Sequence, residues 1–458
     1  MPSIIIRNGR IIDPSQSLDE VADLLIQDGK ITAIGTGLGT ADKEIEATGK
    51  IVSPGLVDTH VQLREPGFEE DETIESGTAA AINGGFTSIA CLPNTSPTTD
   101  TQAQVQFIQQ KASQANNCHV FVIACVSKNR EGQELAEMGI LTQAGAVAFS
   151  DAPHPLQKTD LFRRALEYSR MFDVPILDHP EIPELSQSGL MHSGSISMVL
   201  GLSGMHPDSE ELATGRDLRL AETTGARLHL MDISTEGSVE LIRRAKGRGV
   251  NVSSEICIAN LHLTDEVMRT FDSNYKVNPP LRSQNHIDAC IAGLQDGTID
   301  VITSGHAPRA SEKKMTELDR APFGMSQIEI TLGLAITNLV VPGHLDFPTL
   351  IGKLSTNPAK ALKLDKGTLT VGTTADVTII DPKVTWKVDS NQFASLSTNT
   401  PFNELTLTGR AETVIVGGTI KLQRESCESP QPTSVNFISL SDRWIQSLVG
   451  FRGNRPGQ

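Results

Sequence analysis

Hydrophobic residues recur through the middle of the chain in short runs that are separated by amphipathic stretches. Two of these stretches, residues 163–172 and 238–249, have the spacing of surface helices. Strands that alternate with helices are typical of βα units around a parallel sheet. Seven such units in about 300 residues favour a closed (β/α)₈ barrel, although periodicity alone also permits an open sheet. The apolar runs that predict strands are residues 85–92, 118–126, 146–150, 174–179, 226–234, 251–256 and 299–305.

The two ends of the chain have a different, β-rich pattern. Near the start, Asn8-Gly9 and Asp28-Gly29 each lie between two β-branched runs, which is typical of tight hairpin turns. Near the other end, residues 375–382 and 411–422 contain short Val, Ile and Thr strands, with Gly417-Gly418 at a third predicted turn. We therefore expect both ends to fold together into one small composite β-sandwich beside the barrel.

These patterns divide the chain into four segments. Residues 1–55 form the first part of the predicted sandwich, residues 56–364 form the α/β barrel, and residues 365–422 complete the sandwich. Residues 423–458 have the composition of a loosely ordered tail. Within that tail, DRWIQSLVGF is apolar enough to predict one short docking helix.

Composition excludes several classes of function. The chain has 458 residues and a formal net charge of −16, which opposes binding to a nucleic acid. It has neither an uninterrupted apolar stretch long enough to span a membrane nor the pattern of a secretory signal. The six cysteines include no CxxC pair and indicate reduced thiols. We expect a cytoplasmic protein without nucleic-acid or membrane partners.

Seven motifs carry a specific family resemblance. The first, VSPGLVDTHVQLREPGFEEDETIESGTAAAINGGFTSIACLPNTSP, covers the first predicted barrel strand and its loop. The others are GAVAFSD, LDHPEIPEL, DISTEGSVELIRRAKGRGV, KVNPPLRS, SGHAPR and APFGM, in that order. Together they resemble the dihydroorotases of the amidohydrolase superfamily from about residue 3 to residue 422. The resemblance implies a TIM-type barrel with a composite sandwich and a metal centre at the carboxyl ends of the strands.

The reaction of such a family has clear chemical requirements. Opening or closing a cyclic amide near neutral pH needs a metal-bound hydroxide and a group that moves a proton to the leaving nitrogen. The family supplies a His-x-His pair, a bridging carboxylate, two further histidines and a final aspartate that is both a ligand and the general base. Here His60 keeps the first half of the pair, Asp151 the position of the bridging carboxylate and His179 one later histidine.

Three ligand positions depart from the family pattern. Gln62 replaces the second histidine of the pair, Asp232 replaces a later histidine, and Gly305 replaces the final aspartate. An amide is a poor zinc ligand beside imidazole or carboxylate, and glycine supplies neither a ligand nor a base. Lost acid–base help typically costs about 10²–10⁴ in rate. We expect no cofactor or at most one weakly bound zinc, held by remnants of this set, and no intact catalytic group.

The positions that hold substrate in the family are partly kept. Each also has a structural reading, as a salt-bridge partner at the barrel mouth, a turn cap beside a proline, or a packing residue. The matching residues are Arg64, Asn94, Asn278 and His306. In addition, Arg309 replaces the histidine that ends the family's last motif. We predict that Arg309 pairs with Asp151 or Asp232 in place of a metal.

Two functions from different classes follow from the resemblance. The first is a non-catalytic dihydroorotase-like subunit of pyrimidine biosynthesis that supports the assembly of aspartate carbamoyltransferase, in a homo- or hetero-oligomer. The alternative is a mononuclear cyclic amidohydrolase, dihydroorotase or hydantoinase-like, that uses Asp151, His179 and Asp232. A ligand-binding sensor built on the retained substrate residues is a third option.

Overall fold

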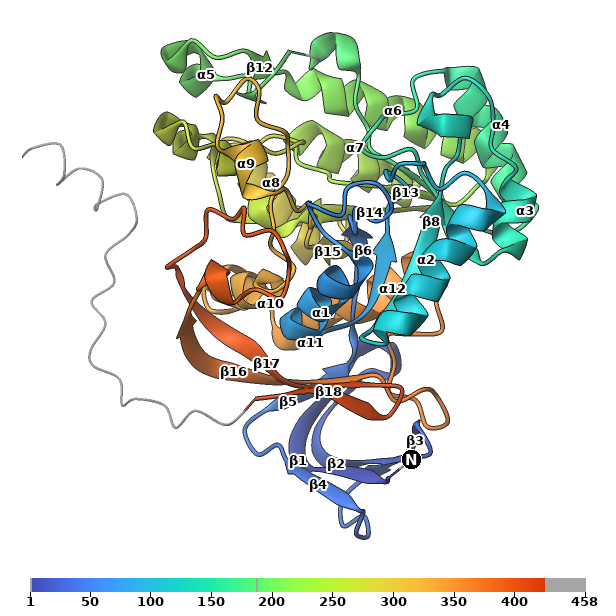
Figure 1. Cartoon of the computed structure of the whole chain (residues 1–458), viewed down its shortest axis with the longest axis vertical. Coiled ribbons are helices and arrows are strands. Elements are labelled where there is room, and N and C mark those ends of the chain that lie inside the picture. Colours follow the sequence, from blue (N-terminus) through green and yellow to red (C-terminus); the bar gives the residue numbers. More distant parts are fainter. Residues whose placement is uncertain (1, 187, 425–458) are drawn as a thin grey trace, which may run out of the picture. The chain divides into compact units, whose positions relative to one another are not determined.

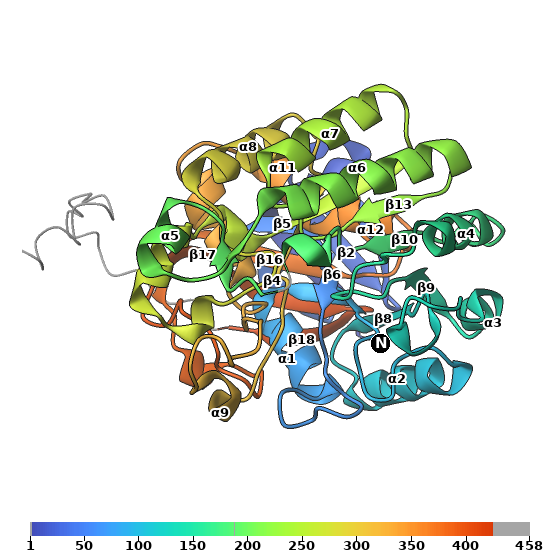
Figure 2. The same cartoon turned by 90° about the horizontal axis from the view of Figure 1, so that it is seen from above.

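The central part of the protein is a closed barrel of eight parallel strands (Figures 1 and 2). The computed structural model describes residues 2–186 and 188–424. The first and last barrel strands contact each other, and Val61 pairs in parallel with His306, so the sheet closes on itself. The prediction of a (β/α)₈ barrel is confirmed. The strands are β6 (Leu56–Val61), β7 (Phe86–Cys91), β8 (His119–Ala124), β9 (Ala146–Phe149), β10 (Ile176–Asp178), β13 (Leu228–Leu230), β14 (Val252–Cys257) and β15 (Val301–Thr303).

Helices surround these strands, as the view from above shows (Figure 2). α4 illustrates why, because Leu161, Phe162 and Leu166 are buried while Arg163 pairs with Glu167 on the outer face. The main helices are α1 (Ile74–Gly84), α2 (Gln102–Ala115), α3 (Met138–Gln143), α4 (Thr159–Ser169), α6 (Pro207–Thr224), α7 (Glu236–Gly247), α8 (Gln284–Gln295), α10 (Thr331–Ala335), α11 (Phe347–Ile351) and α12 (Asn357–Ala361). Two short helices, α5 (Ser195–Leu200) and α9 (Ser311–Lys314), belong to loops.

Strands from both ends of the chain form a second, mixed sheet (Figure 1). Its order is β18-β17-β16-β5-β1-β2-β3, with β4 paired to β1. β1 runs parallel to β4 and β5, and the other pairs are antiparallel. The strands are β1 (Ile4–Asp13), β2 (Leu18–Gln27), β3 (Lys30–Gly35), β4 (Lys43–Glu46), β5 (Ile51–Pro54), β16 (Val377–Lys387), β17 (Thr406–Val416) and β18 (Thr419–Gln423). The helix predicted in DRWIQSLVGF lies outside the described residues.

One of the three predicted turns is wrong. Asp28-Gly29 joins β2 to β3 and Gly417-Gly418 joins β17 to β18, as expected. Asn8-Gly9 instead lies inside β1, where the register with β2 shifts. Asn8 has a φ of 57°, and its backbone N–H donates to the Asp23 carboxylate at 3.0 Å. A side chain at Gly9 would come within 2.4 Å of Val52, so this dipeptide forms a bulge under close packing.

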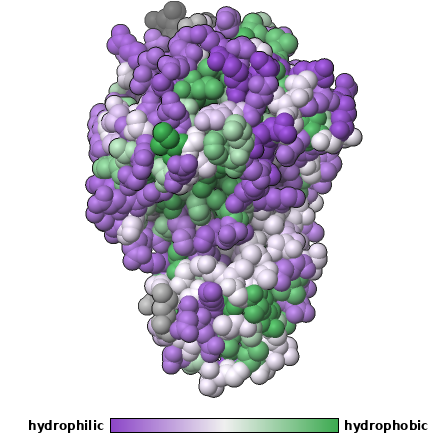
Figure 3. All heavy atoms as spheres, turned by 90° about the vertical axis from the view of Figure 1, so that its right-hand side faces the viewer, coloured by the Kyte–Doolittle hydropathy of each residue, from purple (hydrophilic) through white to green (hydrophobic). Residues whose placement is uncertain are grey.

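The polar surface and the unpaired thiols fit the expectations from the amino-acid composition. Figure 3 shows mainly hydrophilic side chains over the barrel helices, with apolar groups between them. The five cysteines among the described residues are buried and free. None of the helices in residues 2–186 and 188–424 is both long and apolar enough to cross a membrane.

Candidate metal centre at the barrel mouth

A cavity of about 1030 Å³ opens at the carboxyl ends of the barrel strands. Its lining includes residues that end or follow β6, β10, β13, β14 and β15, which converge there because parallel strands share one direction. Among these residues are His60, Glu181, Asp232, Cys257 and Gly305. The barrel therefore gathers polar side chains from distant segments at one place.

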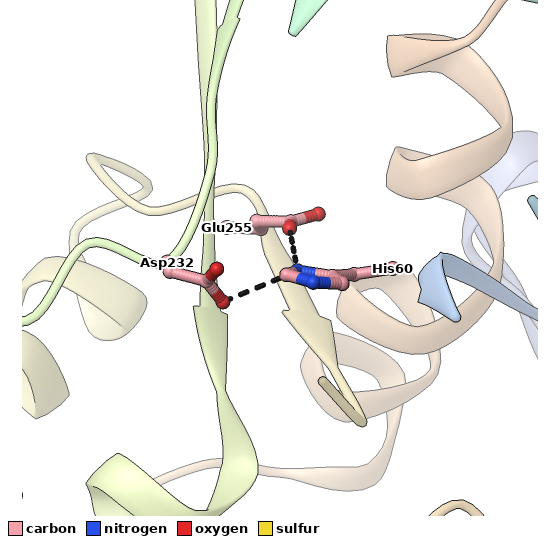
Figure 4. Close-up of side chains that lie close together, drawn as sticks. All are labelled: His60, Asp232 and Glu255. Atoms are coloured by element: carbon pink, nitrogen blue, oxygen red, sulfur yellow. Dashed lines mark hydrogen bonds and ion pairs between the residues drawn. The ribbon is translucent and has the colours of Figure 1, made fainter. Parts of the chain in front are cut away.

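Three buried side chains, two of which line this cavity, form a compact cluster (Figure 4). His60 from β6, Asp232 just after β13 and Glu255 from β14 offer ligand atoms that all lie within 4.8 Å of one another. The His60 Nδ1 atom is 3.1 Å from Glu255 Oε1 and 3.2 Å from Asp232 Oδ1. We call these three residues the ionic cluster. Imidazole nitrogen and carboxylate oxygen are donors that suit zinc.

Further side chains hold the ionic cluster in place. His179, just after β10, has its Nδ1 atom 3.4 Å from Asp232 Oδ2 and its Nε2 atom 3.3 Å from Glu181. On the other side, His229 Nε2 is 3.0 Å from Glu255 Oε2, and the Thr59 hydroxyl donates to the same oxygen. Such outer contacts fix the orientation of the groups that would bind a metal.

The charges of the ionic cluster reinforce one another. Burial by itself lowers the pKa of His60, but the carboxylates of Asp232 and Glu255 overcome that effect and hold it well above its usual value. In the same way, burial opposes the charge on His179, while Asp232 and Glu181 raise its pKa to about 10. Burial raises the pKa of Asp232, but His60 and His179 together bring it below its ordinary value. The Asp232 carboxyl group therefore stays ionised.

Asp151 lines the cavity, but its carboxylate is engaged elsewhere. It accepts hydrogen bonds from the backbone N–H groups of Val126 and Ser127 at 3.0 and 3.1 Å, and from the Ser127 hydroxyl. Burial raises the pKa of Asp151 to about 6. Of the four residues suggested by the sequence, the structure brings His60, His179 and Asp232 together and ties Asp151 to the loop after β8.

The β15 rim, which we define as residues 305–309, has lost room for a carboxylate. Gly305 has a φ of 59°, and a Cβ atom there would lie 2.7 Å from the sulfur of Cys257. That thiol donates to the Ser304 carbonyl at 3.3 Å and accepts from Gln327 Nε2 at 3.1 Å. Cys257 therefore fills the space beside Gly305 and is held there by its own contacts.

The prediction for Arg309 is wrong. Its NH1 atom lies 3.4 Å from the carboxylate of Asp71, and its Nε donates to the Phe323 carbonyl at 3.1 Å. Asp71 lies in the loop between β6 and α1 and is fully buried, whereas Asp151 and Asp232 are already held by other groups. The guanidinium instead shares the Asp71 carboxylate with Lys313, whose Nζ lies 2.9 Å from Asp71 Oδ1.

The residues that match the substrate positions of the family each contact a protein group. Arg64 is buried, its Nε donates to the Pro308 carbonyl at 3.1 Å, and burial and the nearby Arg309 lower its pKa to about 9. Asn94 donates to Gln62 Oε1 at 2.9 Å, and Asn278, which lines the cavity, donates to Glu181 at 2.8 Å. His306 Nε2 lies 3.4 Å from Glu72.

Sequence reasoning missed Glu255. The residue stands in NVSSEI, a run whose pattern predicts only a strand. A glutamate inside a predicted buried strand is itself a signal, because an unpaired buried carboxylate is costly. Its partners His60 and His229 come from two other strands, so only the closed barrel shows the cluster.

Comparisons with known proteins agree with this fold. A family model described as "Dihydro-orotase-like" matches residues 49–238. A dihydroorotase from Pelotomaculum thermopropionicum is 46% identical over 421 residues, covering 92% of this chain and 98% of the relative. One from Syntrophotalea carbinolica is 46% identical over 418 residues, covering 91% and 98%.

A solved structure shows the same fold. The L-hydantoinase (dihydropyrimidinase) from Arthrobacter aurescens superposes with a TM-score of 0.83 at 27% identity, over 93% of this chain and 97% of the other. The 46% sequence identity to the two dihydroorotases, over nearly their whole length, shows more than a shared barrel fold. This chain belongs to the dihydroorotases, the cyclic amide hydrolases of the amidohydrolase superfamily.

Proposed function

We propose that this protein opens or closes a cyclic amide of the dihydroorotate type, with a single metal ion bound by the ionic cluster. The observation that carries the proposal is that ligand atoms of His60, Asp232 and Glu255 lie within 4.8 Å of one another, with His60 and Asp232 lining the cavity. The expected loss of activity finds no support in the comparisons, where chains 46% identical carry the name dihydroorotase. The mononuclear alternative is therefore the better supported reading.

The donor set fits zinc. Catalytic zinc sites commonly combine histidine and carboxylate ligands and keep one position open for water or substrate. The buried Nδ1 atom of His179 has no hydrogen-bond partner among the described residues and lies beside Asp232, which suits a further ligand. A bound zinc supplies an activated water and polarises the amide carbonyl.

The protein's own residues have defined tasks in this proposal. The contacts of His179 Nε2 with Glu181 and of Nδ1 with Asp232 fix the orientation of the imidazole ring beside the ionic cluster. His229 and Thr59 orient the Glu255 carboxylate. Since Gly305 carries no base, we expect turnover about 10²–10⁴ below that of a site with a complete acid–base pair.

The cavity also suits an anionic substrate. Arg130 and Arg309 both line it, and the guanidinium of Arg130 is fixed by the carbonyls of Asp151 and Ala152. Cyclic amides that carry a carboxylate, such as dihydroorotate, would be favoured over neutral rings by these cations.

The test combines metal analysis with turnover. The protein is purified from a host without its own dihydroorotase and assayed for zinc and for dihydroorotate conversion. We expect close to one zinc per chain and slow turnover, and we expect both to fall sharply in His60→Asn and Asp232→Asn. The control is His344→Asn, which alters an exposed histidine. Absence of zinc from the wild-type protein, or of turnover in zinc-loaded protein, would refute the proposal.

A second candidate function rests on the β15 rim. Because Cys257 occupies the space beside Gly305, the barrel can have been retained for its outer surface, as a subunit that supports the assembly of aspartate carbamoyltransferase. Size-exclusion chromatography of the two proteins together tests this. A stable complex with a metal-free, inactive chain would favour the second function over the first.

A further inference from the structure

Asp232 occupies a backbone conformation that needs support. Its φ is 51°, in the left-handed region that residues with a Cβ rarely adopt. This conformation turns the chain sharply between β13 and α7 and brings the carboxylate to His60 and His179. Strained residues persist at sites where surrounding contacts over-determine them.

Glu210 supplies much of that support. It lies in α6, which packs beside α7 (Figure 2), and its carboxylate is buried. Glu210 Oε1 accepts from the backbone N–H groups of Ser234 and Thr235 at 2.9 and 3.0 Å, and from the Thr235 hydroxyl at 3.1 Å. The Ser234 hydroxyl donates to Oε2. A single carboxylate thus fixes Ser234 and Thr235, the second and third residues after Asp232.

Arg282 completes this arrangement. It is 3% exposed, its NH2 atom is 3.4 Å from Glu210 Oε2, and its Nε donates to the Ser234 hydroxyl at 3.0 Å. Its NH1 donates to the Met205 carbonyl at 3.2 Å. The buried charge of Glu210 is therefore paired, and the pair grips Ser234 from two sides.

We infer that Glu210 and Arg282 are positioning residues, which hold the Asp232 turn in the geometry that the ionic cluster needs. Neither residue belongs to the ionic cluster. The inference rests on the proposed function, since it assigns the pair a role in metal binding through Asp232. Outer contacts of this kind typically change metal affinity by about 10- to 100-fold.

The test compares two glutamates of the same helix. Glu210→Gln keeps the shape and removes the charge that grips Ser234 and Thr235. The matched control is Glu222→Gln, because Glu222 also lies in α6 and accepts from Arg248 Nε, just past the C-terminal end of α7, at 2.9 Å. Zn²⁺ affinity is measured by chelator competition, and amide hydrogen exchange is followed in residues 228–240.

The expected result has two parts. Glu210→Gln should bind Zn²⁺ about 10- to 100-fold more weakly and exchange the Ser234 and Thr235 amides faster, while Glu222→Gln matches the wild type in both. Unchanged exchange, or faster exchange with unchanged Zn²⁺ affinity, would overturn the positioning role. Ser234→Ala, which removes one hydroxyl, replaces Glu210→Gln if that variant does not fold.

The two proposals fail in different ways. If the wild-type protein binds no Zn²⁺, the proposed function falls, and the role assigned to Glu210 in metal binding falls with it. If the wild type binds Zn²⁺ and Glu210→Gln binds it equally well, only the positioning role is lost.

Discussion

The ionic cluster and the β15 rim lie at the same barrel mouth but are stabilised in opposite ways. In the cluster, each buried charge faces an opposite charge, as where His60 lies between Asp232 and Glu255. At the rim, Gly305 offers no side chain, and the sulfur of Cys257 fills the space beside it. A side chain can be lost where neighbouring atoms fill the space that it leaves. Loss of one member of a buried ion network, by contrast, leaves the charges of its partners uncompensated.

The largest expected effect is on the free energy of unfolding, and it tests the contrast between the ionic cluster and the β15 rim. Asp232→Ala leaves His60 and His179 without their shared carboxylate, and we expect the free energy of unfolding to fall by about 3–5 kcal/mol. Urea unfolding of metal-free protein measures it. The control Asp288→Ala changes an exposed aspartate of α8 and should stay within about 0.5 kcal/mol. Equal stabilities of the two variants would show that the cluster is not tightly coupled.

The second prediction concerns Glu329, a buried carboxyl group that no cationic side chain contacts through a hydrogen bond among the described residues. Glu329 accepts from the backbone N–H groups of Ala394 and Ser395, and burial raises its pKa to about 7. The folded state holds this proton more tightly than the unfolded state. The contribution of Glu329 to the free energy of unfolding is therefore fully present below pH 4.5 and is lost as the pH rises through about 7. The change is about 3 kcal/mol from the size of the shift.

Glu329→Gln should remove that part of the pH dependence, because glutamine keeps the acceptor and cannot ionise. Unfolding free energies are compared at pH values on both sides of the window. Glu404→Gln, at an exposed position, should keep the wild-type slope. A Glu329→Gln protein with the same slope as the wild type would place the titration on other groups.

The sequence predicts the barrel well because its evidence is local. Apolar runs such as residues 118–126 and 226–234 become strands wherever they are long enough and bounded by polar segments. The Asn8-Gly9 turn fails because the same dipeptide also suits a bulge, and only Val52 from another strand decides between them.

The site is less predictable, since its contacts join distant segments. His60, His179 and Asp232 could be proposed from motifs, but Glu255 meets them only through the pairing of β13, β14 and β15 around the barrel. The orientation of Asp151 depends on Ser127, which comes from the preceding loop. No pattern along the chain encodes either contact.

The third prediction tests whether Cys257 closes the rim. Gly305→Asp places a Cβ 2.7 Å from the Cys257 sulfur, at a φ of 59°, and we expect a loss of about 1–3 kcal/mol in unfolding free energy. Adding Cys257→Ala should recover part of that loss, so the two changes are not additive. A double variant as unstable as the sum of both single variants would contradict the steric account.

The smallest effect is expected for Arg309→His. Arg309 contacts Asp71 at 3.4 Å, but Asp71 also accepts from Lys313 Nζ at 2.9 Å and from the Ala310 backbone N–H at 2.8 Å, so its carboxylate stays satisfied. We expect a change of at most about 1 kcal/mol in unfolding free energy. The new imidazole should add no zinc, because the side chain at this position points to Asp71 and not to the ionic cluster. A second zinc per chain in Arg309→His would show that the rim still holds a metal position, and the contrast between the two sides of the mouth would then fail.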